Sequence, residues 1–475
     1  MKSIIYSIIF ILYALVTISL IILERKQPEK TIAWLLIFVL LPPVGIILYL
    51  FLGRNWKIYK LRENFSPDVQ DLIYNAMGRL DNMEYFPLIE LLANNSESPL
   101  YVNNDITVFN SGEEKFRCLK NELKKAKHHI HLEYYIVKSD SIGNEIKDIL
   151  IEKAKQGIKI RFIMDRVGAI RVKRSYINEL KAAGIDVVEY SYFLAPILKL
   201  INTQINYRNH RKIVVIDGEV GFVGGINIGD EYLGKGKLGF WRDTHLMIKG
   251  DFVLGLQAVF IDDYITIKEA NKEISFHGED FENYFRPIGR EDGKLMQLIR
   301  SGPDSKYHSI EQGILKMISI AKHHVYITSP YFVPSESIQE ALKIAALGGI
   351  DVKILFPGTY DHLIVYYASR TYLSELSKCG VEIYMYNPES FIHSKVITVD
   401  SKLCTVGTAN MDRRSFELNY EINAVIYDSN VSQQLEAAFM NDLKLSRRVT
   451  EDDWDNSPRI TKVLESFSRI FSSLL

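Results

Sequence analysis

The sequence has few cysteines and almost no net charge. Its 475 residues include three cysteines, 57 lysines and arginines, and 58 aspartates and glutamates, so the formal net charge is −1. Cys118, Cys379 and Cys404 lack the spacing of a disulfide framework or a structural zinc site. Without an excess of positive charge, a histone-like protein that binds polyanions non-specifically is excluded. At about 150 residues per domain, the length predicts about three structural units.

Charged residues are also absent from two runs near the N-terminus, residues 4–23 and 32–52. Each run is long enough to cross a hydrocarbon core of about 30 Å, so we expect a transmembrane hairpin. A cleaved signal peptide fits less well, because the first run is followed by the charged loop 24–30 rather than by small residues. Five cations flank the two runs and three lie between them. This bias favours both termini, and the large domain after the hairpin, in the cytoplasm.

The rest of the sequence contains an internal repeat. Three segments of the first copy recur in the second in the same order and at nearly constant spacing: 126–136 as 321–331, 157–163 as 349–355, and 180–187 as 376–383. Such self-similarity indicates duplication. In both copies, short Ile- and Val-rich runs alternate with helical patterns, which is typical of an α/β fold.

We therefore expect an α/β fold in which two duplicated half-domains form a pseudo-dimer behind the N-terminal hairpin. The C-terminal tail has apolar residues at helical spacing, so it could lie on a membrane surface or pack on the body. The apolar stretch 192–205 could line a lipid entrance or belong to the core. The expected organisation is a transmembrane hairpin (1–62), a linker with a helical stretch (63–100), two repeats (101–284 and 285–448) and an amphipathic tail (449–475).

The most specific signal is a motif, HxKx4Dx6GxxN, that occurs once in each repeat without insertion or deletion. It comprises His210, Lys212, Asp217, Gly224 and Asn227 in the first repeat, and His393, Lys395, Asp400, Gly407 and Asn410 in the second. Four polar residue types at fixed spacing, present twice, predict a composite site built from both repeats.

The residue types of the motif suit a phosphodiester substrate. Along a strand, His and Lys two residues apart project from one face. The two lysines would balance the anionic phosphate oxygens, and the amides of Asn227 and Asn410 would add neutral donors. One neutral imidazole could attack phosphorus while the other, protonated, gives a proton to the leaving alkoxide. This scheme needs no metal and no other cofactor.

The acidic residues have two possible readings. Asp217 and Asp400 lie where a hairpin turn is expected, and at odd spacing from the His, so a turn-forming role and a direct catalytic role are both open. Asp243 and Glu421 follow the two motifs and could orient a nucleophilic His, or could be ordinary surface acids. The cluster of His128, His129 and His131 is better explained as a strand entry than as a metal site, because the second copy keeps only two of the three histidines. These two are His323 and His324.

The duplicated motif resembles the phospholipase D superfamily, and the rest of the chain is similar to the bacterial cardiolipin synthases of that type. The resemblance covers the chain from the first span to the C-terminus, and its most similar segments are 31–36, 41–45, 49–54, 224–232, 301–304, 329–334 and 410–416. It implies a multi-pass protein of the bacterial cell membrane. The implied reaction is phosphatidyl transfer between two phosphatidylglycerol molecules, which gives cardiolipin and glycerol through a phosphohistidine.

The resemblance also implies roles for the individual residues. One of the two motif histidines would be the nucleophile and the other the general acid. Family analogy gives the order as His210 for the nucleophile and His393 for the general acid. Each His would be supported by an acid of the opposite half, Glu421 toward His210 and Asp243 toward His393.

Other functions are less compatible with the sequence. A hydrolytic phospholipase D, or a phosphatidyltransferase that uses another alcohol, would share every motif residue. A DNA phosphodiesterase is disfavoured by the membrane hairpin and by the neutral net charge, so no nucleic-acid partner is expected. A non-catalytic scaffold would tolerate loss of motif residues, and none is lost.

Overall fold

The computed structural model describes Ser19, residues 28–41, 44–45, 49, 85–190, 207–270, 281–285 and 293–472. Contacts divide the chain into one unit of Met1–Ile58 with Ser191–Tyr207, and a second of Tyr59–Tyr190 with Arg208–Leu475. The apolar stretch 192–205 therefore lies outside the described residues.

The described part of the first unit contains the helix α2 (Pro28–Leu40). Phe38 and Tyr49 are buried there beside Trp34, whose ring centroid lies 5.1 Å from that of Tyr49. The first predicted span lies outside the described residues except for Ser19, and only part of the second is described. Within the described ranges, no helix combines the length and the apolar character needed to span a bilayer.

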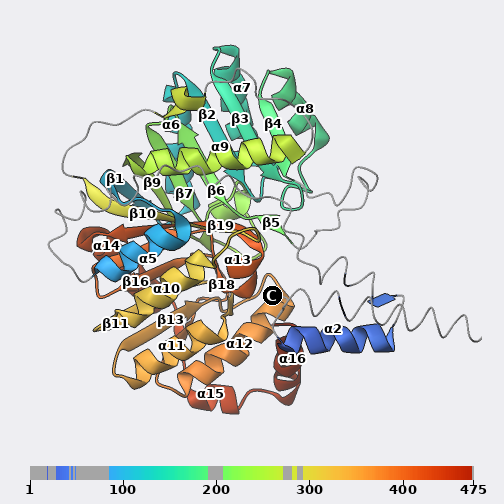
Figure 1. The fold of residues 1–475 in the computed structure, drawn as a ribbon, viewed down its shortest axis with the longest axis vertical. Helices are drawn as coiled ribbons and strands as arrows, with labels where there is room; N and C mark the ends of the chain where they lie inside the picture. The colour runs from blue at the N-terminus through green and yellow to red at the C-terminus, as the bar shows by residue number, and fades with distance from the viewer. Residues whose placement is uncertain are drawn as a thin grey trace, which may run out of the picture. The chain divides into compact units, whose positions relative to one another are not determined.

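One 16-stranded sheet forms the centre of the second unit (Figure 1). Its order is β20-β14-β13-β11-β16-β17-β19-β10-β1-β9-β7-β6-β2-β3-β4, and β5 pairs with β19. The first repeat supplies β1 (Tyr101–Phe109), β2 (His129–Tyr134), β3 (Lys159–Asp165), β4 (Asp186–Tyr190), β5 (Arg208–Asn209), β6 (Lys212–Ile216), β7 (Val220–Gly224) and β9 (His245–Gly250). The second supplies β10 (Lys294–Ser301), β11 (His324–Thr328), β13 (Asp351–Phe356), β14 (Glu382–Met385), β16 (Val396–Val399), β17 (Leu403–Gly407), β19 (Asn419–Tyr427) and β20 (Arg447–Val449).

The duplication is visible in this strand order. β1 and β10 pair antiparallel at the junction of the repeats. From that junction, the first repeat runs outward as β1-β9-β7-β6-β2-β3-β4, and the second as β10-β19-β17-β16-β11-β13-β14. The two series use equivalent strands in the same order. The prediction of an α/β fold with two duplicated half-domains is therefore confirmed.

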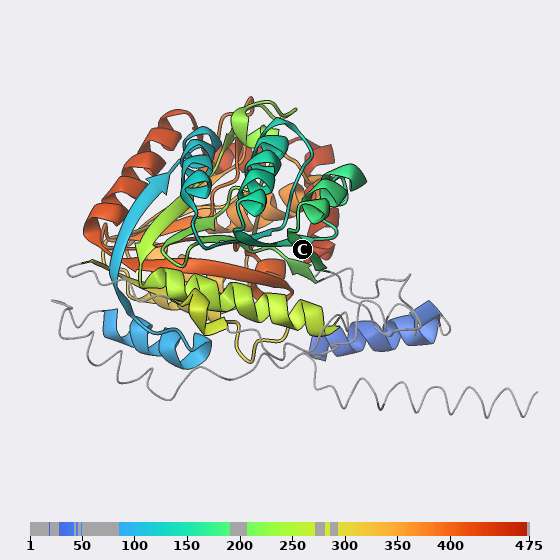
Figure 2. The same cartoon turned by 90° about the horizontal axis from the view of Figure 1, so that it is seen from above.

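Helices cover both faces of the sheet (Figures 1 and 2). Alternation along β11 shows why, because Val325 and Ile327 pack toward α10, α11 and α12, whereas Tyr326 packs against Phe439 of α14 on the other face. One layer contains α6 (Gly112–Lys125), α7 (Ser141–Lys155), α8 (Arg174–Ala182), α10 (Ser309–Ser319), α11 (Glu336–Leu347) and α12 (Leu363–Ser377), and the other contains α9 (Phe252–Ala270) and α14 (Ser429–Lys444).

The ends of this unit add helices to the body. In the expected linker, α5 (Phe86–Ser96) buries Leu88, Ile89 and Leu92 completely. These residues join the core of the second repeat, so this part of the segment is folded with the body. The remaining elements are η4 (Asp230–Leu233), β8 (Trp241–Arg242), η5 (Phe281–Tyr284), β12 (Phe332–Val333), β15 (Phe391–Ile392), β18 (Met411–Asp412), α13 (Arg413–Glu417), α15 (Glu451–Asp455) and α16 (Arg459–Ile470).

The two motifs form the hairpins that their sequence predicts. β6 pairs antiparallel with β7, and β16 with β17. Asp217 and Gly218 have φ of 57° and 72°, and Asp400 and Ser401 have φ of 52° and 55°. Two successive positive φ values match the right-handed twist of the flanking strands, which is why Asp and Gly suit these turns.

Candidate active site

Two short parallel strand pairs cross between the repeats. β5, just before the first motif, pairs with the start of β19 in the second repeat. β15, just before the second motif, pairs with β8 in the first repeat. In each pair, the strand just before the motif of one repeat lies beside the strand that leads to an acidic residue of the other repeat. That residue is Glu421 for the first motif and Asp243 for the second.

The first of these pairs brings His210 to Glu421. The backbone N–H of His210 donates to the carbonyl of Tyr420 at 3.0 Å. Nδ1 of His210 then lies 2.9 Å from Oε1 and 3.0 Å from Oε2 of Glu421. Both side chains are buried. A carboxylate on Nδ1 fixes the proton there and leaves Nε2 for chemistry.

The second pair repeats the arrangement with the roles of the repeats exchanged. The backbone N–H of His393 donates to the carbonyl of Arg242 at 2.8 Å. Its Nδ1 lies 2.7 Å from Oδ2 of Asp243, which is completely buried. The structure thus contains both His–acid contacts that the resemblance implied.

The two motif lysines lie beside their histidines. Nζ of Lys212 donates to the carbonyl of His210 at 2.6 Å. Nζ of Lys395 donates to the carbonyl of His393 and lies 2.9 Å from Nδ1 and 3.2 Å from Nε2 of its ring. The charge of Lys395 also acts on His210 and on Lys212. The two motifs therefore share one electrostatic site.

Burial shifts the lysines toward the neutral form. It lowers the pKa of Lys212 to about 7, although the carboxylate of Glu421 opposes this shift. It lowers the pKa of Lys395 to about 8, against the opposing effect of Asp243. A low-dielectric pocket disfavours an ammonium that lacks a full counter-charge. An anionic phosphodiester would supply that charge, so the site is suited to bind one with uptake of protons.

Burial also favours the neutral form of both histidines. It lowers the pKa of His210, and Glu421 offsets the effect only in part. It lowers the pKa of His393 to about 4, with the charge of Lys395 adding to the effect. For Glu421 itself, burial would raise the pKa, but His210 and Lys212 outweigh it and the pKa is lowered. Glu421 is thus ionised beside a neutral imidazole at neutral pH.

The two histidines differ at Nε2. The hydrogen bonds of His210 to Glu421 are made by Nδ1, and among the described residues none donates to or accepts from Nε2 of His210. Nε2 of His393 instead has Nζ of Lys395 at 3.2 Å. Which of the two histidines is the nucleophile stays a prediction.

Aromatic side chains that the sequence reasoning missed line the site. The ring of Tyr135 lies 4.9 Å from that of His210, and Nζ of Lys212 lies 5.5 Å from its centroid. The rings of Trp241 and Tyr232 lie 5.2 Å and 6.2 Å from that of His393. Their positions are the hint that the sequence offers, because Tyr135 lies near the end of the repeated segment 126–136 and Trp241 precedes Asp243 by two residues.

The two motif asparagines differ in their contacts. Oδ1 of Asn227 accepts from the N–H of Ile136 at 3.1 Å, and its Nδ2 donates to the hydroxyl of Tyr232 at 3.0 Å. Oδ1 of Asn410 is buried without a hydrogen-bond partner among the described residues. Asn227 therefore also positions the loop after β2, and phosphate binding by either amide remains a prediction.

The hydrogen bonds of Asp217 and Asp400 go to backbone N–H groups at the starts of β2 and β11, and not to the side chains of His210 and His393. The carboxylate of Asp217 accepts from the backbone N–H groups of Lys127, His128 and His129 at 2.7 to 3.0 Å. Asp400 accepts from residues 322–324 in the same way, at 2.8 Å. Each aspartate also lies beyond the end of a strand that starts next to the motif His. These contacts favour the turn-forming alternative for Asp217 and Asp400, and a direct catalytic role for them stays a prediction.

The histidines of the first repeat form a hydrogen-bonded chain. Nε2 of His129 lies 3.0 Å from Oε1 of Gln257, whose Nε2 lies 2.9 Å from Nδ1 of His131. His131 in turn contacts Arg161 at 3.0 Å. In the described ranges, no group of three His, Cys, Asp or Glu side chains is arranged to hold a metal ion.

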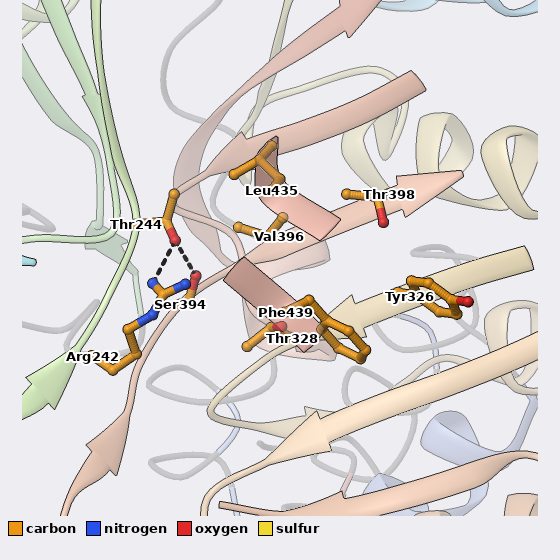
Figure 3. A pocket seen from close by; sticks show the side chains of 9 residues that line it. All are labelled: Arg242, Thr244, Tyr326, Thr328, Ser394, Val396, Thr398, Leu435 and Phe439. Carbon is orange, nitrogen blue, oxygen red and sulfur yellow. Dashed lines mark hydrogen bonds between the residues drawn. The ribbon is translucent and has the colours of Figure 1, made fainter. Parts of the chain in front are cut away.

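A small pocket lies beside the second motif rather than at the histidines (Figure 3). Ser394 donates to Oγ1 of Thr244 at 2.7 Å, and Arg242 donates to the same oxygen at 2.9 Å. Arg242 is also paired with Asp442 at 3.0 Å. These contacts fix the segment that carries Asp243. The residues around this pocket thus hold Asp243 in place, and none of the candidate catalytic residues lines the pocket.

The duplicated fold and the paired motifs define a phospholipase D-like protein. In agreement, the family model described as "Cardiolipin synthase, PLD-like domain" matches residues 119–237 and 314–443, one match in each repeat. A model described as "Phospholipase_D-nuclease N-terminal" matches residues 9–54.

Curated relatives extend over nearly the whole chain. A cardiolipin synthase of Geobacillus kaustophilus is 44% identical, over 97% of this chain and 92% of the relative. The "Major cardiolipin synthase ClsA" of Bacillus subtilis is 39% identical, over 100% of this chain and 99% of the relative. The chain therefore belongs to the bacterial cardiolipin synthases of the phospholipase D superfamily. This confirms the prediction of a phosphatidyltransferase of that type.

A solved structure supports the fold alone. The crystal structure of phosphatidylserine synthase from Haemophilus influenzae aligns with a TM-score of 0.63 at 14% identity. The alignment covers 82% of this chain and 100% of that one.

Proposed function

We propose that the enzyme transfers a phosphatidyl group from one phosphatidylglycerol molecule to another, giving cardiolipin and glycerol. The observation that carries this proposal is the reciprocal pair of His–acid contacts, His210 with Glu421 and His393 with Asp243, beside two lysines with lowered pKa. The names of the curated relatives support the product.

In the first step, Nε2 of His210 attacks the phosphorus of the donor. A phosphorus–nitrogen bond forms and the bond from phosphorus to the glycerol headgroup breaks. The departing oxygen takes a proton from His393, which the bound anion favours in its charged form. Glu421 stabilises the positive charge that develops on His210, and the two lysines balance the phosphate oxygens.

In the second step, the terminal hydroxyl of another phosphatidylglycerol attacks the phosphohistidine. His393, now neutral, accepts the proton of that hydroxyl, and the phosphorus–nitrogen bond breaks. His210 returns to its neutral form and cardiolipin leaves. The amides of Asn227 and Asn410 supply donors to the phosphate in both steps.

The proposal includes the membrane. Residues 4–23 and 32–52 would span the bacterial cell membrane as a hairpin, with both termini in the cytoplasm. The match of residues 9–54 to a family-specific N-terminal model supports a dedicated segment there. A reporter fused after Arg62 tests the orientation, because activity only outside the cytoplasm would overturn it.

The reaction is tested by its products. Purified full-length enzyme is incubated with phosphatidylglycerol in detergent, and lipids and released glycerol are quantified, with the His210→Ala variant as the blank. Cardiolipin and glycerol in equal amounts support the proposal. Phosphatidic acid without cardiolipin would identify a hydrolase, and a product formed only when another alcohol is added would identify a different acceptor.

A further inference from the structure

The C-terminal helix α16 presents its apolar side to the outside of the body. Ile460, Val463, Phe467 and Ile470 are 72%, 65%, 54% and 73% exposed. At 100° per residue these positions fall on one side of the helix. A stripe of large apolar side chains with this exposure is unusual on a soluble surface and marks an interaction site.

The polar side of the same helix is already attached to the body. α16 packs along α12 (Figure 1). Glu465 accepts from Nε of Arg370 at 2.7 Å, and Arg469 pairs with Glu375. Ser468, which lies between Glu465 and Arg469 in the sequence, is buried. The helix therefore docks with its charged face, which is the reverse of an ordinary surface helix, and leaves the apolar face for another partner.

The charges around the exposed face suit an anionic lipid surface. Arg459 is exposed and falls next to Val463 and Ile470 on the helical wheel. Lys462 is also exposed, but it falls nearer to Arg469, and its Nζ donates to the carbonyl of Asp455 at 2.7 Å. Cations at the border of an apolar face are typical of helices that lie in the membrane interface, where they meet lipid phosphates.

The residues at the start of α12 lie near the second motif. Tyr360, Leu363 and Ile364, at the start of α12, are each exposed by more than two fifths. Asp361, in the turn between them, accepts from the hydroxyl of Tyr331 and acts electrostatically on His393 and Lys395. Exposed apolar side chains thus occur both near the second motif and on α16.

We propose that the apolar face of α16 docks on the bilayer itself, with Ile460, Val463, Phe467 and Ile470 entering the lipid and Arg459 at the headgroups. The partner is an anionic phospholipid surface. This contact is additional to the N-terminal spans, and it holds the second repeat against the membrane that contains the lipid substrate. The inference of this contact rests on the exposed side chains of α16 and not on the proposed reaction.

A depth-sensitive label tests the proposal in the full chain. Cys118→Ser and Cys379→Ser remove the partly exposed thiols, while the fully buried Cys404 stays. Val463→Cys is labelled with an environment-sensitive dye and reconstituted into vesicles of phosphatidylglycerol. Leu445→Cys, at 59% exposure on the end of α14, is the matched control.

The Val463 label should show blue-shifted emission and quenching by lipids that carry a nitroxide on the acyl chain, and the Leu445 label should show neither. Equal behaviour of the two labels would overturn the proposal. A blue shift at Val463 without nitroxide quenching would also overturn it, because protein and not lipid would then cover the face.

A second set of variants reads the contact through turnover. Val463→Ser, Phe467→Ser and Ile470→Ser together should lower turnover of bilayer phosphatidylglycerol by about threefold or more, since interfacial binding scales with buried apolar area. Turnover of a short-chain, monomeric phosphatidylglycerol should be unchanged. Leu445→Ser should change neither. Equal loss on both substrates would indicate a structural role and contradict the docking. If the enzyme forms no cardiolipin at all, only the proposed reaction fails, and the label still tests the docking.

Discussion

Oε1 of Glu421, in the second repeat, lies 2.9 Å from Nδ1 of His210, in the first. The reciprocal contact joins Asp243 of the first repeat to His393 of the second at 2.7 Å. Each catalytic candidate thus receives its orienting acid from the other repeat. The duplication therefore yields one site with two halves rather than two independent sites.

Loss of the orienting charge should slow turnover without unfolding the enzyme. Glu421→Gln keeps the size of the side chain but removes the charge that stabilises a charged His210. We expect kcat to fall by about 10²-fold or more, as for loss of acid–base support. The exposed Glu219→Gln is the matched control and should leave kcat unchanged. Unchanged kcat in Glu421→Gln would contradict the role of this acid.

Both histidines should be required in the same chain. His210→Ala removes the nucleophile and His393→Ala removes the general acid, so each variant should lose turnover in the product assay. Mixing the two purified variants should not restore it, because the strand pairs that build the site lie within one chain. Full activity of either variant would refute the mechanism of two histidines.

The pH profile should reflect the buried lysines and histidines. Phosphate binding uses charged lysines, and burial lowers the pKa of Lys212 to about 7 and of Lys395 to about 8. kcat/KM should therefore fall more steeply as the pH rises through 7 to 8, where these groups lose their protons, in addition to the decline from deprotonation of His393, whose pKa burial lowers to about 4. On the acid side, burial lowers the pKa of His210, so its neutral form should persist below pH 6.5.

The profile is measured as kcat/KM at constant ionic strength. A constant value up to about pH 10, the ordinary range of lysine, would contradict the lowered pKa of Lys212 and Lys395. An acid limb above about pH 6.5 would contradict the lowered pKa of His210.

The motif aspartates should affect stability and not chemistry. Asp217→Asn tolerates the positive φ of the turn but weakens three hydrogen bonds to backbone N–H groups by removing the charge. We expect the free energy of unfolding to fall by about 1–3 kcal/mol, with kcat per folded enzyme unchanged. Asp400→Asn should behave alike. A large loss of kcat with an unchanged free energy of unfolding would instead support a direct catalytic role for Asp217.

The hairpins and repeats could be predicted because local patterns encode them. Asp217 and Gly218 favour a turn with positive φ, and the flanking Ile- and Val-rich runs have the length of strands. The hairpin turns expected at Asp217 and Asp400 lead into β7 (Val220–Gly224) and β17 (Leu403–Gly407). The His–acid contacts followed from the resemblance, because spacing alone could not assign an acid to the His of the other repeat.

The surroundings of the site could not be predicted in this way. Tyr135 and Trp241 meet His210 and His393 only because loops far apart in sequence converge at the sheet. Neither periodicity nor spacing identifies such contacts. For the same reason, the pattern of α16 could not decide between membrane and body, whereas the fold shows that its polar face is the one attached to α12.

The most direct test of the account is to trap the covalent intermediate. His393→Ala is incubated with phosphatidylglycerol labelled in its phosphate, quenched in alkali to preserve phosphohistidine, digested and mapped by mass spectrometry. A phosphatidyl group on His210, absent from the His210→Ala enzyme, is the predicted result. A label on any other residue, or cardiolipin formation by the His210→Ala enzyme, would contradict the account.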